Sequence, residues 1–179
     1  DTNAQTWNVP FAARLKGPVG DRTIRQMLTA PVTEIPLDGD CPDWVMPNAG
    51  GTGYWRFDTN AENLTALISN FDSLSDAEQI MFADALTSGF RAGRISTDDL
   101  MTGLAATSSG HPRAVSEGFG IIGTLDRMLE PSEQAGLRAW VQHTYGPLAE
   151  YLESRPATAL SQQEMLLRDR LYGLLLEYG

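Results

Sequence analysis

Apolar side chains recur with two different periods along this chain. Near the start, in TWNVPFAARL, Trp7, Val9 and Phe11 stand at every second position, which is the period of a half-buried strand. From Thr59 onward the spacing becomes that of an amphipathic helix. The first helical stripe consists of Leu64, Leu67, Ile68 and Phe71. The pattern predicts a mainly α protein with a small N-terminal β-module: a sandwich-like segment over residues 1–58, then a helical domain over residues 59–179.

The first segment contains short strands separated by turns. KGPVGD and DGDCPD have the glycine and proline content of turns, and Pro31 and Pro36 favour edge strands over a long helix. WVMPNAGGTGYWRFD reads as a strand, a glycine-rich turn and a second strand. In that second strand Tyr54, Arg56 and Asp58 would share one face, and Trp55 and Phe57 the other. The segment is therefore predicted to be antiparallel.

The helical part carries start and stop signals. Thr59 with Glu62, and Ser75 with Glu78, have capping-box spacing, Gly93 is a plausible stop, and Ser96 is a plausible start. Further on, prolines organise the pattern. Pro112 would begin a helix that runs to about Glu130, and Pro131 would begin the next. Pro147 predicts a kink or break near Tyr145–Gly146. The sequence thus predicts about six helices in antiparallel pairs, as a bundle or a short α-solenoid.

The net charge of the chain argues against two classes of binding partner. The 179 residues include 13 Lys and Arg against 23 Asp and Glu, a net charge of −10. Nucleic acid and anionic membrane surfaces need a basic face, so neither is predicted as a partner. No apolar run reaches the roughly 20 residues of a membrane span, so no insertion is predicted. The sequence starts at Asp1 and suggests a mature form or a piece of something larger, and it assigns no compartment.

Candidate chemistry is sparse. His111 and His143 are far apart and form no zinc-binding pair at helical spacing, so solvated or structurally satisfied side chains are expected. NAGGTG lacks the lysine of a phosphate loop, and the lone Cys41 reads as an inert thiol. Arg56 could pair with a carboxylate or reach a cleft, and Asp84 could face solvent or bond a neighbouring loop. No catalytic, cofactor or metal residue is predicted.

Two stretches nevertheless resemble a known family. PNAGGTGYWRFDTNAENLTALISNF, preceded by a tryptophan, and LSDAEQIMFADALTSGFRAGRIS are similar to the C-terminal portion of M1-family zinc aminopeptidases of the aminopeptidase N type. The resemblance is specific from Trp44 to about Ile95. The positions that match the family patterns and that we single out are Trp44, Asn48, Gly53, Tyr54, Arg56 and Asp84.

The resemblance implies a β-sandwich end followed by a helical domain, with the six matched residues in structural roles. In such enzymes the zinc lies in a separate catalytic domain of the same polypeptide, and the zinc-binding motifs are not found in this sequence. The helical domain of the family closes over the chamber that holds peptide substrates. The chain would then be a non-catalytic scaffold and chamber wall, while the parent enzyme removes N-terminal amino acids from peptides.

One alternative stays open on the residues alone. Helix pairs without catalytic groups also suit a stand-alone module that binds a protein or peptide on a helix-lined groove. Because the family's helical domain is usually longer than the part after Asp58, the resemblance implies either a truncated chain or a member with a short domain.

Overall fold

The computed structural model describes residues 7–178; residues 1–6 and 179 lie outside this part. The chain forms two compact units, of which the first ends at Met81 and the second begins at Phe82. This division falls inside helix α2 (Asp76–Arg91). The domain boundary predicted between residues 58 and 59 remains a prediction. Each unit is described below by itself.

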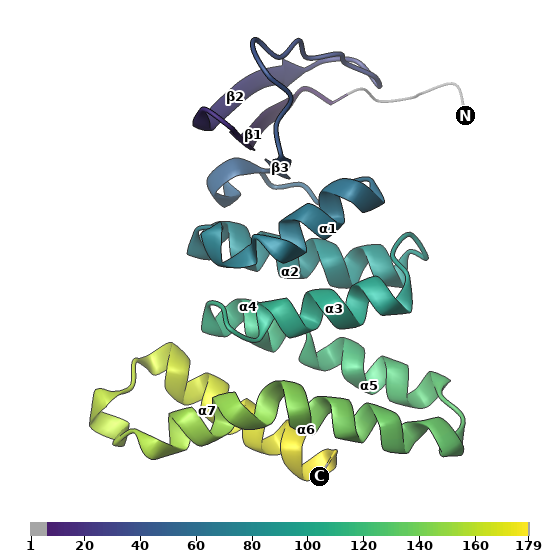
Figure 1. The fold of residues 1–179 in the computed structure, drawn as a ribbon, viewed down its shortest axis with the longest axis vertical. Coiled ribbons are helices and arrows are strands. Elements are labelled where there is room, and N and C mark those ends of the chain that lie inside the picture. Colours follow the sequence, from purple (N-terminus) through teal and green to yellow (C-terminus); the bar gives the residue numbers. More distant parts are fainter. Residues whose placement is uncertain (1–6, 179) are drawn as a thin grey trace. The chain divides into compact units, whose positions relative to one another are not determined.

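The first unit begins with a three-stranded antiparallel sheet (Figure 1). Its strands are β1 (Val9–Gly17), β2 (Gly20–Leu28) and β3 (Trp44–Pro47), in the order β2-β1-β3. The register pairs Gly17 with Gly20, so the turn lies within KGPVGD as predicted. Ala13 and Leu15 of the central strand are fully buried, as the two-residue period requires. The small N-terminal β-module is confirmed.

One predicted strand does not form. After β3 the backbone turns through a short 3₁₀ segment (Ala49–Gly51), and residues 54–58 have no strand pairing. Gly50 and Gly51 have positive φ angles, which tighten the turn beyond that of a simple hairpin. Trp55 instead folds back onto the sheet: its ring stacks on Phe11 with centroids 5.4 Å apart, and its indole N–H donates to the carbonyl of Pro10. Aromatic packing therefore replaces the second strand.

A side chain occupies the outer edge of β3. Asn63, on helix α1 (Ala61–Ser69), accepts a hydrogen bond from the Val45 N–H at 2.7 Å and donates one to the Val45 carbonyl at 2.8 Å. Its amide nitrogen also donates to the Thr59 hydroxyl at 2.7 Å. The cap of α1 is Asn60, so the predicted Thr59–Glu62 box is wrong. Thr59 is displaced from the cap because its hydroxyl is engaged in positioning Asn63.

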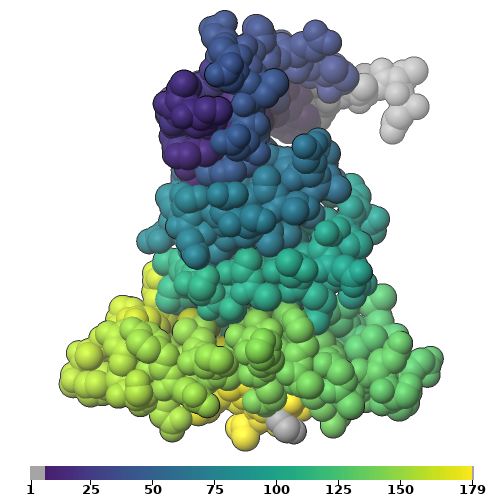
Figure 2. All heavy atoms as spheres, viewed as in Figure 1, coloured from purple at the N-terminus to yellow at the C-terminus, as the bar shows by residue number. Residues whose placement is uncertain are grey.

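The rest of the first unit consists of a 3₁₀ turn (Phe71–Ser73) and the start of α2. The second unit contains the end of α2 and helices that follow one another closely, as Figure 1 shows. These are α3 (Thr97–Thr107), α4 (Pro112–Glu117), α5 (Phe119–Met128), α6 (Pro131–Ser154) and α7 (Gln162–Glu177). Helices α6 and α7 form an antiparallel pair, and Figure 2 shows the atoms of this unit, in teal to yellow, closely packed. The mainly α fold is confirmed.

Two boundaries in the second unit differ from the prediction. The helix expected from Pro112 to Glu130 is divided at Gly118, where a Cβ atom would lie 2.6 Å from a methyl group of Leu104. Of the kink or break expected near Tyr145–Gly146, the break is wrong, since α6 continues through Pro147. Tyr145 and Ala149 are buried on either side of that proline, and their packing offsets the lost hydrogen bond. Within residues 7–178 no helix is long and apolar enough to cross a membrane.

Candidate functional site

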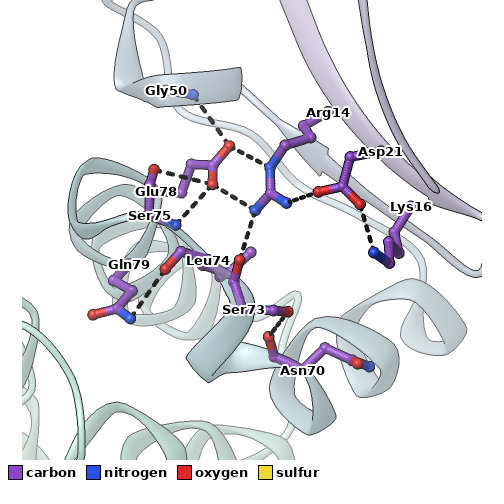
Figure 3. Close-up of polar contacts among 10 residues, drawn as sticks. All are labelled: Arg14, Lys16, Asp21, Gly50, Asn70, Ser73, Leu74, Ser75, Glu78 and Gln79. Atoms are coloured by element: carbon purple, nitrogen blue, oxygen red, sulfur yellow. Dashed lines mark hydrogen bonds and ion pairs between the residues drawn. The ribbon is translucent and has the colours of Figure 1, made fainter.

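An ion pair between a half-buried arginine and a buried glutamate joins the sheet and α2 in the first unit. Arg14 on β1 and Glu78 in the first turns of α2 are 64 residues apart in sequence. The Arg14 Nε donates to one carboxylate oxygen at 3.0 Å and an Nη to the other at 2.6 Å (Figure 3). The side chains are 16% and 2% exposed. Such a two-point contact fixes both position and orientation, and so ties the sheet to α2.

The Glu78 carboxylate has further partners. The N–H of Gly50 donates to one oxygen at 3.2 Å, while the N–H and hydroxyl of Ser75 donate to the other at 3.0 and 3.1 Å. Burial opposes the charged form, but the hydrogen bonds from Arg14, Ser75 and Gly50 outweigh it, so the pKa of Glu78 is lowered. The Ser75–Glu78 pairing predicted at the start of α2 therefore exists, and it belongs to a larger network.

Arg14 is engaged on all sides. Its second Nη donates to Asp21 at 2.8 Å, and the Nη that faces Glu78 also reaches the Ser73 carbonyl at 3.2 Å. The guanidinium carbon lies 4.7 Å from the ring centre of Trp44, in a cation–π contact. The hydrogen bond to Glu78 raises the pKa of Arg14, so the arginine stays charged. Because each guanidinium nitrogen already has an acceptor, Arg14 is suited to support and has little left to offer a ligand.

The glycine-rich loop beside this network is held by one asparagine. Asn48 is fully buried and has φ 61°, the left-handed conformation that asparagine tolerates best among non-glycine residues. Its amide accepts from the Gly53 N–H at 2.6 Å and donates to the Gly53 carbonyl at 2.9 Å. Gly53 has no room for a side chain, because a Cβ atom would overlap the Trp55 indole. These contacts close the loop on itself.

An open hollow of about 490 Å³ adjoins the ion pair. Arg14 and Glu78 line it, together with Arg25, Thr23 and Thr52. The half-buried Arg14 neutralises the buried charge of Glu78, and both oxygens of Glu78 already accept hydrogen bonds. Among residues 7–178, no three His, Cys, Asp or Glu side chains are grouped as metal ligands would be. These contacts hold the sheet, the glycine-rich loop and the start of α2 in fixed positions relative to one another.

The structure brings three of the six family-motif residues together. Trp44, Asn48 and Gly53 belong to β3 and its loop, and the first two are buried. Tyr54 is fully exposed beside them. Arg56 has an exposed side chain with an interaction partner, and Asp84, in the second unit, is half-buried and also has a partner. Their roles in the family motif remain predictions.

Sequence reasoning missed two residues. Arg14 was not predicted, because it lies on the opposite face of β1 from the buried Ala13 and Leu15, where the two-residue period predicts a solvent-facing side chain. Asn63 was the second residue that was not predicted. No local pattern identifies it, since its partner Val45 lies 18 residues away.

The match to a known protein family begins at β3 and covers all the helices described above. A family model described as the ERAP1-like C-terminal domain matches residues 44–179, from the first residue of β3 to the last residue of the chain. No curated protein matched the chain.

Proposed function

We propose that this chain supports the catalytic domain of an M1-family aminopeptidase and forms a wall of its peptide chamber. The premise is that the chain belongs to the ERAP1-like C-terminal domain family and is a C-terminal part of such an enzyme. The catalytic domain would belong to the same polypeptide. The parent enzyme would be a zinc-dependent hydrolase of the aminopeptidase N type that removes N-terminal amino acids from peptides. Its zinc would lie in the catalytic domain.

The observation that supports this role is the closed state of the Arg14–Glu78 network. A catalytic acid or base needs a proton-accepting or proton-donating atom within reach of a substrate. The oxygens of Glu78 are instead shared among Arg14, Ser75 and Gly50, with 2% of its side chain exposed. A residue fixed in this way contributes rigidity, which suits a support on which helices are mounted.

The test compares the parent polypeptide with and without the helical part, residues 59–179 of the numbering used here. Hydrolysis of an aminoacyl chromogenic substrate and of peptides of increasing length is measured as kcat/KM, together with the temperature of inactivation. If the helical part supports the catalytic domain, its removal should lower the inactivation temperature of the parent enzyme. If the helical part forms a wall of the chamber, its removal should change the ratio of kcat/KM between short and long peptides by about tenfold or more. This corresponds to about 1.4 kcal/mol in transition-state binding.

The purified 179-residue chain serves as the second arm. It is expected to show no hydrolysis of the chromogenic substrate and no stoichiometric zinc by elemental analysis. Hydrolysis by this chain alone would contradict the proposal. An unchanged length preference in the shortened parent would contradict the wall, and an unchanged inactivation temperature would contradict the support.

A further inference from the structure

A groove runs between helices α4 and α7 of the second unit. It has a volume of about 180 Å³, and its walls come from Pro112, Arg113 and Ser116 on α4 and from Gln163, Leu166, Leu167 and Arg170 on α7. The α7 residues are spaced i, i+3, i+4 and i+7, so they share one face of that helix. Both walls are regular helix, so the groove is preformed.

The floor of the groove is apolar. Leu167 is buried, with 3% of its surface exposed, and anchors α7 in the core of the unit. Leu166 beside it is 58% exposed, which leaves a large aliphatic surface facing solvent next to a hollow. An exposed leucine alone is ordinary, but an exposed leucine that borders a concave apolar surface is typical of a contact site.

The rim of the groove is positively charged. Arg113 and Arg170 both line it, both are exposed, and neither forms an ion pair within the part of the chain that the structure describes. Its lining contains no Asp or Glu. In a chain of net charge −10, a hollow bordered by two arginines and no carboxylate is locally of the opposite sign. Charge complementarity therefore selects an anionic occupant.

The groove is longer than one side chain. A neighbouring hollow of about 330 Å³ shares Pro112, Gln163 and Leu167 with it and extends toward His111 and Tyr151. Glu164 also lines this second hollow, but its carboxylate is paired with Arg155 at 2.7 Å. Tyr151 is 56% exposed there, and aromatic side chains are favoured in polypeptide contacts. Together the two hollows can receive several consecutive residues of a polypeptide.

From these observations we infer that the α4–α7 groove binds an acidic segment of another polypeptide. An aliphatic side chain of that segment packs on Leu166 and Leu167, and flanking carboxylates pair with Arg113 and Arg170. Two arginines are too few for a nucleic acid or an anionic membrane, for which several phosphate contacts are needed. The site does not depend on the chamber role, and either can fail without the other.

The experiment uses the full 179-residue chain and a short fluorescent peptide with blocked ends, in which one leucine is flanked by aspartates and glutamates. Binding is followed by fluorescence anisotropy. The acidic peptide is expected to bind more tightly than its asparagine and glutamine counterpart, and added salt should weaken it. Arg113→Gln and Arg170→Gln should each weaken binding about threefold to tenfold, in the range of an exposed to partly desolvated ion pair.

Matched variants separate the groove from general effects. Arg168→Gln removes the same charge from α7 outside the groove, and Leu176→Ser removes an exposed leucine elsewhere on α7, in contrast to Leu166→Ser. Both controls should leave binding within about twofold, and thermal unfolding of every variant checks its folding. Equal binding of acidic and neutral peptides, or equal losses in groove and control variants, would overturn the inference. So would a dimer of the chain that Arg170→Gln abolishes, since the occupant would then be a second copy.

Discussion

At the scale of single residues, Glu78 determines how the first unit is held together. Replacing it by glutamine keeps the shape but leaves Arg14, which is only 16% exposed, with the half-exposed Asp21 as its remaining carboxylate partner. Glu78→Gln is expected to lower the free energy of unfolding by about 3 kcal/mol, as found when one partner of a buried pair is removed. Urea unfolding followed by tryptophan fluorescence measures the loss. Glu34→Gln, at an exposed loop position, should change it by no more than about 0.5 kcal/mol.

The same carboxylate makes stability depend on pH. Because the pKa of Glu78 in the folded chain lies below its ordinary value of 4.5, its contribution is fully present above that value. The contribution is lost as the pH falls through the lowered folded pKa. Unfolding free energies measured between neutral pH and pH 3 should therefore decline less steeply in Glu78→Gln than in the unmodified chain. An identical decline in both would contradict this assignment.

Gly53 is the second residue with a sharp requirement. A Cβ atom there would overlap the Trp55 indole, which would have to leave its stacked position on Phe11. Gly53→Ala is expected to cost about 1–3 kcal/mol, the usual range for overpacking. At Gly136, inside α6, an added Cβ would meet nothing within 4 Å, so Gly136→Ala should stabilise the chain by up to about 1 kcal/mol. Thermal unfolding of both variants gives the comparison, and a harmless Gly53→Ala would contradict the packing argument.

At the scale of elements, local sequence signals succeed where the hydrogen bond they imply is also local. Ser96 caps α3 by accepting from the Asp99 N–H at 3.1 Å, and Gly93, with φ 70°, ends α2, as both were predicted to do. The signal at Thr59 failed because a distant strand decides the outcome there. Its hydroxyl accepts from Asn63, which is itself held by Val45.

Helix α6 contains two prolines whose positions in the helix predict opposite effects on stability. Pro147 lies in its interior, where it removes a backbone hydrogen bond, whereas Pro131 is at the first turn, where no such bond is lost. Pro147→Ala is therefore expected to stabilise the chain by about 1–3 kcal/mol. Pro131→Ala should be neutral or slightly destabilising. Both proline side chains are exposed, so a loss of buried surface does not contribute to the difference between the thermal unfolding midpoints of the two variants. A loss of stability in Pro147→Ala would show that the proline is needed for packing.

At the scale of the whole molecule, the sequence predicted the class of fold but not the contacts that join its parts. Period and composition identified a β-module followed by helices, because each helix or strand buries one face and so repeats its apolar residues regularly. The Arg14–Glu78 pair joins residues 64 positions apart, and no periodicity encodes such a partnership. The division at Met81 and Phe82 lies within an uninterrupted helix, where no glycine, proline or polar linker marks it.

The pairing of Asn63 with Val45 has a consequence for covalent modification. Asn63, Leu64 and Thr65 form the Asn-x-Thr pattern that oligosaccharyltransferases recognise. The side-chain nitrogen has two hydrogens, and it donates both, to the Val45 carbonyl and to the Thr59 hydroxyl. A sugar would replace one of those hydrogens. A glycan on Asn63 would therefore remove one of these two hydrogen bonds, so attachment there would compete with the contacts that join α1 to the edge of β3.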